Sequence, residues 1–135
     1  MTRSNRFRPT MTTLLAGALI SPMAHGATAA ELEAAYTAQA GAPASPARGQ
    51  ELFTTRHGRE WSCSSCHGAV PTRAGSHAAT GKPIAPLAPA FNTERLTDAA
   101  KAEKWLRRNC NDVVGRECSA AEKADVISWL RTLKP

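Results

Sequence analysis

The sequence predicts a single all-α domain, and three observations carry this prediction. Two segments, one near the middle of the chain and one at its end, begin with residues that favour helix starts. Each then carries apolar residues at helical spacing. The residues around a central cysteine pair lack the alternating β-branched run typical of a strand. Residues 80–91 hold three prolines and almost no periodicity, which indicates a loop.

Residues 1–29 have the pattern of a secretory leader. Three arginines precede the apolar run Met11–Ile20, and small residues follow it. Cleavage is expected after residues 24–26 or after residues 27–29, and we take the second site, which leaves residues 30–135 as one exported domain. The apolar run is half of the about 20 residues that a membrane span needs, so an uncleaved anchor is the lesser alternative. We therefore expect a bacterial periplasmic protein whose mature part has no transmembrane segment.

The net charge argues against a nucleic-acid partner. It is +6 for the whole chain, and the leader, with three arginines and no acidic residue, supplies half of it. No block of lysines and arginines with interleaved aromatic residues is present. Arg107 and Arg108 fit a solvated helix face or a small docking surface better.

The first predicted helix of the mature chain spans residues 46–53. Ser45 is a suitable N-cap, and Pro46 is suited to the first helical position. Gly49 and Phe53 lie four residues apart and share a face.

The central cysteine motif is Cys63-Ser-Ser-Cys66-His67. A thioredoxin-like dithiol would need a βαβ setting, which the flanking sequence does not show. A zinc site would have to add Cys110 and Cys118, whose separation by seven residues exceeds the usual two to four. The third use is covalent haem attachment, for which C-x-x-C-H is the recognised local signature.

The chemistry of haem attachment explains this spacing. Cys63 and Cys66 lie on one face of a helical turn, so both thiols can form thioethers along one edge of a porphyrin. His67 is then carried under the ring, where its imidazole can be the proximal iron ligand. Gly68 allows a close approach of the backbone. We expect one haem c, held through two thioethers.

The ligand on the other side of the iron is less obvious. All three methionines lie within the first 23 residues, so a mature chain cannot have a His/Met iron. His77 is one candidate for this position, whereas His57 is expected to be exposed. A lysine, another unusual side chain or no ligand are the remaining choices. Arg73 and Lys82 are candidates for pairing with the haem propionates.

A second predicted helix, capped by Thr97 or Asp98 and running to residue 109, offers another candidate. One of its faces carries Ala102, Trp105, Leu106 and Asn109. Asn109 would then be an amide on an apolar face, and burying an amide without a partner costs about 2 kcal/mol. Iron would be one such partner, and a helix C-cap role is the alternative.

The last predicted helix, residues 119–133, begins with a capping box of Ser119 and Glu122. Its apolar stripe consists of Val126, Trp129, Leu130 and Leu133. A glycine on one helix lets a large side chain of another approach closely, so the Gly49 face of the first helix is expected to cross the last helix at Trp129. Such a crossing resembles the terminal-helix contact of class I cytochromes c.

Residues 72–130, together with the cysteine motif just upstream, are similar to the sphaeroides haem protein family of oxygen-binding monohaem class I cytochromes c. The resemblance spans about residues 31–130. Its most specific segments are TGK at 80–82, APLAP at 85–89, EKW at 103–105 and RNCN at 108–111, followed by Cys118.

The resemblance implies the remaining parts of the haem site. Pro86 and Leu87 would lie against the haem, with the Pro86 carbonyl accepting a hydrogen bond from Nδ1 of His67, which raises ligand basicity. Trp105 would line the same pocket. Asn109 would be the distal iron ligand.

The resemblance also implies a disulfide between Cys110 and Cys118, next to that ligand. A multihaem cytochrome c, with a membrane cytochrome b as a further candidate, would be the electron donor.

The ligand chemistry then indicates a function. An amide oxygen is a hard, weak donor that suits ferric iron better than ferrous iron, so reduction should release Asn109. The open position could bind oxygen, nitric oxide or a related small ligand, and reduction of oxygen or peroxide with a redox partner's electrons is a further candidate activity. The alternative is a plain low-potential electron carrier in which Asn109 never leaves.

Overall fold

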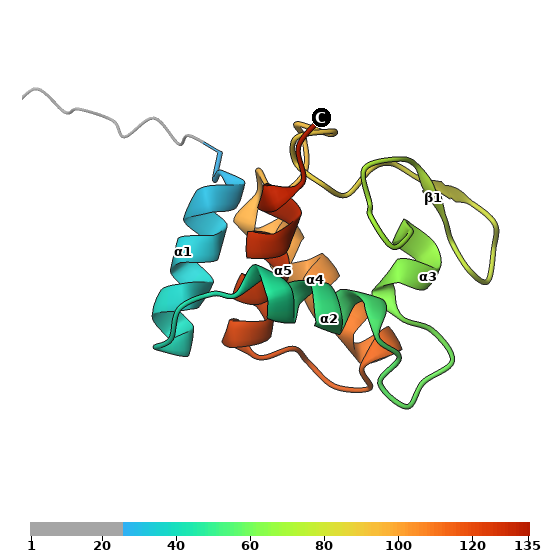
Figure 1. Ribbon diagram of the computed structural model, residues 1–135, viewed down its shortest axis with the longest axis horizontal. Helices are drawn as coiled ribbons and strands as arrows, with labels where there is room; N and C mark the ends of the chain where they lie inside the picture. Colours follow the sequence, from blue (N-terminus) through green and yellow to red (C-terminus); the bar gives the residue numbers. More distant parts are fainter. Residues whose placement is uncertain (1–25) are drawn as a thin grey trace, which may run out of the picture.

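The computed structural model describes residues 26–135 and confirms an all-α fold (Figure 1). Five helices are joined by loops, and the one sheet among these residues pairs two short antiparallel strands. The helices are α1 (Ala29–Ala40), α2 (Pro46–Thr54), α3 (Cys63–His67), α4 (Ala99–Val113) and α5 (Ala120–Thr132), and the strands are β1 (Gly75–Ser76) and β2 (Pro83–Ile84). Within residues 26–135 no helix combines the length and the apolar character that crossing a membrane requires.

Helix α1 has no counterpart among the helices expected from the sequence. Thr28 and Glu31 form a capping box at its start, and Gly41 ends it in the left-handed conformation. Leu32 and Tyr36, one turn apart, are buried against α5. The predicted leader lies outside the described residues except for its last four, and cleavage after Ala29 would remove the Thr28 cap.

The predicted crossing of α2 and α5 is confirmed. Both helices begin with the expected N-caps, Ser45 and Ser119. A Cβ atom on Gly49 would lie 2.0 Å from the carbonyl oxygen of Asp125, so only glycine allows the two backbones to approach this closely. The rings of Phe53 and Trp129 meet with their centroids 4.9 Å apart.

The core consists of two clusters on opposite sides of α5. The first joins α1, α4 and α5 and contains Leu32, Tyr36, Ala102, Ala124 and Ile127. The second joins α2 and α5 and contains Phe53, Val126, Trp129 and Leu130, with Leu133 at its edge. Leu96, on the loop before α4, packs against both clusters with a left-handed backbone, φ 59°. The expected apolar stripe of the last helix is therefore confirmed as core.

Helix α4 differs from its prediction at its end. Asp98 is its N-cap, as one of the two expected residues, but the helix continues to Val113 instead of ending near residue 109. Asn109 therefore lies inside the helix, which excludes the C-cap role. Trp105 is 44% exposed, so the face expected to be apolar and buried is only partly covered.

Residues 80–91 form a loop, as expected, with one addition. Pro83 and Ile84 make up β2 and pair with β1 in the register Gly75 to Ile84 and Ser76 to Pro83. Strands of two residues lie below the length at which an alternating pattern can be recognised.

Candidate functional site

Helix α3 carries the cysteine motif on a single turn. Ser62 caps this turn, and its backbone N–H donates to Oγ of Ser65 at 3.0 Å. Cys63 and Cys66 are both free thiols and half-buried, three residues apart on the turn. Their common face is the arrangement that attachment to one edge of a porphyrin requires.

The environment of Cys63 distinguishes it from a redox dithiol. Its side chain packs against the second core cluster, and burial raises the pKa of its thiol to about 11, with the nearby Cys66 as a smaller cause. Reactive dithiols need the opposite shift, because the thiolate is the nucleophile. The zinc alternative is contradicted more directly, since Cys110 and Cys118 form a disulfide and cannot supply thiolate ligands.

His67 is half-buried directly after the second cysteine of the motif. Its half-buried ring lies 6.0 Å, between centroids, from that of Phe53. Burial, and then the charge of Arg95, lowers the pKa of the imidazole, which favours the neutral form that binds metals. No hydrogen bond reaches this ring from any residue in the range 26–135.

The chain packs closely around the motif. A Cβ atom on Gly75 would lie 2.1 Å from the carbonyl oxygen of Cys66, so β1 runs directly against α3. The backbone N–H of Ala78 donates to Sγ of Cys66 at 3.3 Å. Gly68, after the histidine, has a positive φ of 79° that favours glycine.

The Pro86 and Leu87 pair lies near the motif, but one expected hydrogen bond is wrong. Leu87 packs against the same core cluster as Cys63, in agreement with a place beside the haem. The carbonyl of Pro86 accepts from Nδ2 of Asn92 at 3.2 Å and from Nε of Arg95 at 3.0 Å. It therefore accepts from these two side chains instead of His67.

Arg95 is the residue that sequence reasoning missed. It donates to the carbonyls of both Ala85 and Pro86, and it influences His67 electrostatically. A single arginine in the segment NTERLT carries no motif, and only the folded chain brings it beside the loop of residues 85–87.

Asn109 lies half-buried on α4, and its amide makes no hydrogen bond within the described part of the chain. The guanidinium of Arg108, the residue directly before it, lies 5.5 Å from the ring centre of the exposed Trp105, one turn earlier. A mid-helix asparagine with an unused amide is free to bind another group.

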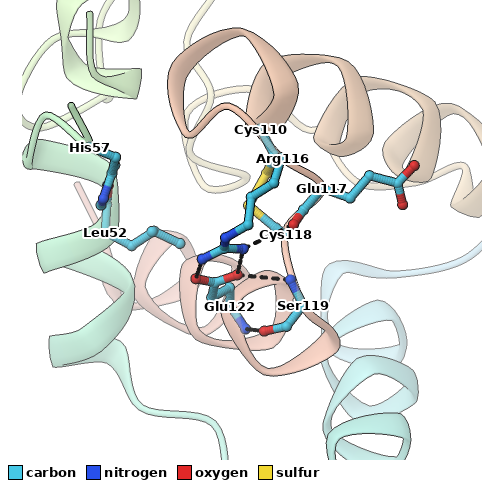
Figure 2. A network of polar contacts seen from close by, with 8 residues as sticks. All are labelled: Leu52, His57, Cys110, Arg116, Glu117, Cys118, Ser119 and Glu122. Atoms are coloured by element: carbon cyan, nitrogen blue, oxygen red, sulfur yellow. Dashed lines mark hydrogen bonds and ion pairs between the residues drawn. A yellow bond between two sulfur atoms is a disulfide. The ribbon is translucent and has the colours of Figure 1, made fainter. Parts of the chain in front are cut away.

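The predicted disulfide between Cys110 and Cys118 is confirmed, with the two Cα atoms 5.6 Å apart. It joins the last turn of α4 to the residue before the α5 cap (Figure 2). In Figure 2 the Arg116 fork also binds Glu122, at 2.7 and 2.8 Å, and Glu122 accepts from the backbone N–H of Ser119. The loop after the Asn109 helix is thus held by a covalent bond and an ion pair.

The other candidates lie in less favourable positions. His77 is exposed at the hairpin turn, where its carbonyl accepts from the backbone of Thr80 and Gly81. Arg73 and Lys82 are exposed. His57 is half-buried rather than exposed, because its ring lies 2.9 Å from the carbonyl of Leu52.

These residues fit a covalently bound haem. Two half-buried thiols share a helical turn, burial lowers the pKa of the adjacent imidazole, whose ring makes no hydrogen bond within residues 26–135, and Leu87 packs against the same core cluster as Cys63. The group would be held by Cys63, Cys66 and His67.

Comparison with known proteins also leads to haem-binding proteins, the c-type cytochromes. A family model described as "Domain of unknown function (DUF1924)" matches residues 39–130. The chain is 51% identical over 122 residues to the cytochrome c-type protein SHP of Cereibacter sphaeroides, covering 87% of this chain and 94% of that protein. It is 46% identical over 80 residues to cytochrome c'' of Methylophilus methylotrophus, covering 59% of this chain and 56% of that protein.

Solved structures agree with these sequence matches. The structure of oxidised SHP, described as an oxygen-binding cytochrome c, superposes with a TM-score of 0.76 at 50% identity, covering 80% of this chain and 99% of that one. Oxidised cytochrome c'' superposes with a TM-score of 0.71 at 38% identity, covering 79% and 95%. A solution structure of cytochrome c'', concerned with the structural basis of haem-ligand detachment, gives 0.71 at 35% identity.

Proposed function

The chain belongs to the family of monohaem c-type cytochromes that includes SHP and cytochrome c'', and from this premise we propose that it binds small gases after Asn109 leaves the iron. As a member it carries one haem c. Its cysteine motif supplies the two attachment points. When bound, the haem provides a redox-active iron with two axial positions.

His67 would hold one axial position. Its position directly after Cys66, its lowered pKa and the absence of a hydrogen bond to its ring within residues 26–135 support this role. The Phe53 ring lies beside the imidazole, with the ring centroids 6.0 Å apart.

Asn109 would hold the other axial position in the oxidised state. The observation that carries this proposal is its half-buried amide, which has no hydrogen bond in the described chain and lies in mid-helix, where capping is excluded. The absence of methionine after residue 23 supports it, because the usual alternative ligand is missing. An amide oxygen is a weak ligand for reduced iron, so reduction would release it.

Release would open the position for a small ligand such as oxygen or nitric oxide. The description of the related SHP as oxygen-binding, and the ligand detachment studied in cytochrome c'', support this step. The disulfide at Cys110 and the ion pair of Arg116 fix the end of α4, so the amide can move by side-chain rotation while the helix stays in place.

Export to the periplasm and an electron donor of the multihaem cytochrome c class belong to the same proposal. The exposed face of α4 supports a protein donor, since it presents Lys101, Lys104 and Arg108 around Trp105. An acidic partner would be attracted to such a surface, and the attraction would weaken with added salt.

The experiment that tests the ligand assignment replaces Asn109. In the haem-loaded protein, Asn109→Ala should leave the iron five-coordinate in both oxidation states, and Asn109→His should keep it six-coordinate and low-spin in both. Visible and electron paramagnetic resonance spectra, recorded in both oxidation states, distinguish five-coordinate from six-coordinate low-spin iron.

A matched control is Asn111→Ala, an exposed asparagine two residues further along α4. It should reproduce the spectra of the unchanged protein. If Asn109→Ala also leaves the oxidised spectrum unchanged, another residue is the ligand and the assignment is wrong.

A further inference from the structure

Residues 26–29 contact the folded domain, although the sequence placed them in the leader. Ala27 packs against the first core cluster, which joins α1, α4 and α5. A Cβ atom on Gly26 would lie 3.0 Å from the carbonyl oxygen of Thr97, so the chain at this point already runs against the segment before α4. Contact with the domain therefore begins within the predicted leader.

The start of α1 depends on Thr28. Its hydroxyl oxygen accepts from the backbone N–H of Glu31 at 3.2 Å, and the Glu31 carboxylate accepts from the backbone N–H of Thr28 at 2.7 Å. The carbonyl of Thr28 accepts from the backbone N–H of the buried Leu32 at 3.0 Å. These bonds satisfy backbone groups that the start of a helix otherwise leaves without partners.

The two cleavage sites expected from the sequence differ in what they would remove. Both have small residues at the first and third positions before the cut, so the sequence does not separate them. A cut after Ala29 removes the core contact of Ala27 and the whole cap of Thr28. It also places the new ammonium group at the start of α1, where the helix dipole disfavours a positive charge.

A cut after Gly26 keeps the cap and the core contact. The new ammonium group is then on Ala27, outside the helix. Within residues 26–135 the peptide between Gly26 and Ala27 takes part in no hydrogen bond, whereas Ala29 is already the first residue of α1. Backbone that is free of hydrogen bonds is the better substrate for proteolysis.

We propose that a signal peptidase hydrolyses the peptide bond between Gly26 and Ala27, so that the mature chain begins at Ala27 with the cap of α1 complete. Water adds across this bond, which leaves a carboxylate on Gly26 of the released leader and an ammonium group on Ala27. Cleavage here replaces the site after Ala29 that the sequence favoured. This step rests on the export that is part of the proposed function, and it does not depend on the haem.

The test reads the N-terminus of the exported protein. The full chain is expressed with its own leader in a bacterium that attaches haem c in the periplasm, and the purified product is analysed by N-terminal sequencing and intact mass. We expect Ala27 as the first residue. An exported protein that begins at Ala30, or at any other residue, overturns the inference.

Two leader variants form a matched pair. Gly26→Leu places a large side chain directly before the proposed cut, so the product that begins at Ala27 should be lost. Ala29→Leu makes the same change before the other site and should leave Ala27 as the first residue. If Ala29→Leu shifts the N-terminus and Gly26→Leu does not, the inference is wrong.

A second readout measures the effect of the cap on stability. Two haem-loaded proteins that begin at Ala27 and at Ala30 are made behind the same unrelated leader. Loss of the cap should shift the unfolding equilibrium of the shorter protein about fivefold towards the unfolded state. Equal stability of the two proteins would remove the structural basis of the inference.

The outcomes separate this inference from the proposed function. An exported protein that begins at Ala30 contradicts the cleavage site alone, whereas a chain that stays in the cytoplasm with its leader contradicts export as well. A failure of the gas-binding proposal would appear elsewhere, as an unchanged oxidised spectrum in Asn109→Ala.

Discussion

Of the two half-buried polar residues of α4, Glu103 and Asn109, it is Asn109 whose side chain makes no hydrogen bond within the described chain. Asn111 bonds back to the carbonyl of Arg107, and Glu103 accepts from Tyr36 and Lys123. The sequence indicated Asn109 through its helical spacing, but it left a C-cap role open because propensity does not fix where a helix ends. Only the continuation of α4 to Val113 decides between the two roles.

The cysteine motif and Arg95 mark the limits of sequence reasoning at the scale of single residues. Cys63, Cys66 and His67 could be assigned because their chemistry requires neighbours in the sequence. Arg95 could not, because its partners lie nine and ten residues away in a loop without periodicity. The same reason explains the wrong partner assigned to the Pro86 carbonyl.

Gly49 gives a sharp prediction at this scale. In Gly49→Ala the added Cβ would lie 2.0 Å from the Asp125 carbonyl, so the two helices must separate. Overpacking of this kind should cost about 3 kcal/mol of unfolding free energy, measured by denaturant titration of the haem-loaded protein. Gln50→Ala, at the adjacent exposed position, should change it little, and equal stability of the two variants would contradict the tight crossing.

Among the helices, α1 was missed for a physical reason. Its sequence is rich in alanine and polar residues, and only Leu32 and Tyr36 are buried, so its apolar stripe is too narrow to recognise. Helices α2 and α5 could be predicted because caps and apolar stripes coincide in them. The two strands could not, since two-residue strands have no period.

Two of the interactions that hold α4, the helix of Asn109, lie at different points along its length. One is the disulfide at Cys110, which contributes about 2.5 kcal/mol by restricting the unfolded chain. The other is a polar network in which Glu103 accepts from the ammonium of Lys123, at 2.7 and 2.8 Å, and from the hydroxyl of Tyr36, at 2.6 Å. The Lys123 side chain is 10% exposed, whereas the Glu103 side chain is 42% exposed.

The unequal burial of this pair predicts an unequal response to mutation. Glu103→Gln leaves a buried ammonium without its counter-charge. It should lower the free energy of unfolding by about 2 kcal/mol, less than for a fully buried pair. Lys123→Met leaves Glu103 near water, where it can be hydrated, and adds apolar surface to the core, so its loss of unfolding free energy should be smaller than that of Glu103→Gln. Thermal unfolding of both variants measures the order, and a larger loss in Lys123→Met would contradict it.

At the scale of the molecule, α5 is the centre of the fold. It separates the two core clusters, and the helix that carries the proposed ligand packs on one side while the cysteine motif packs on the other. The sequence predicted this all-α class from the capped segments with helical spacing, from the lack of an alternating run around the cysteine pair and from the proline-rich loop. It could not predict the division into two clusters, because that depends on α1.

The measurement that tests the central claim most directly is the visible spectrum of the exported protein, first air-oxidised and then reduced without oxygen. The account predicts a six-coordinate oxidised form and a five-coordinate, high-spin reduced form that takes up oxygen or carbon monoxide. A reduced form that stays low-spin with sharp α and β bands, and ignores carbon monoxide, would contradict it and favour a permanent electron carrier.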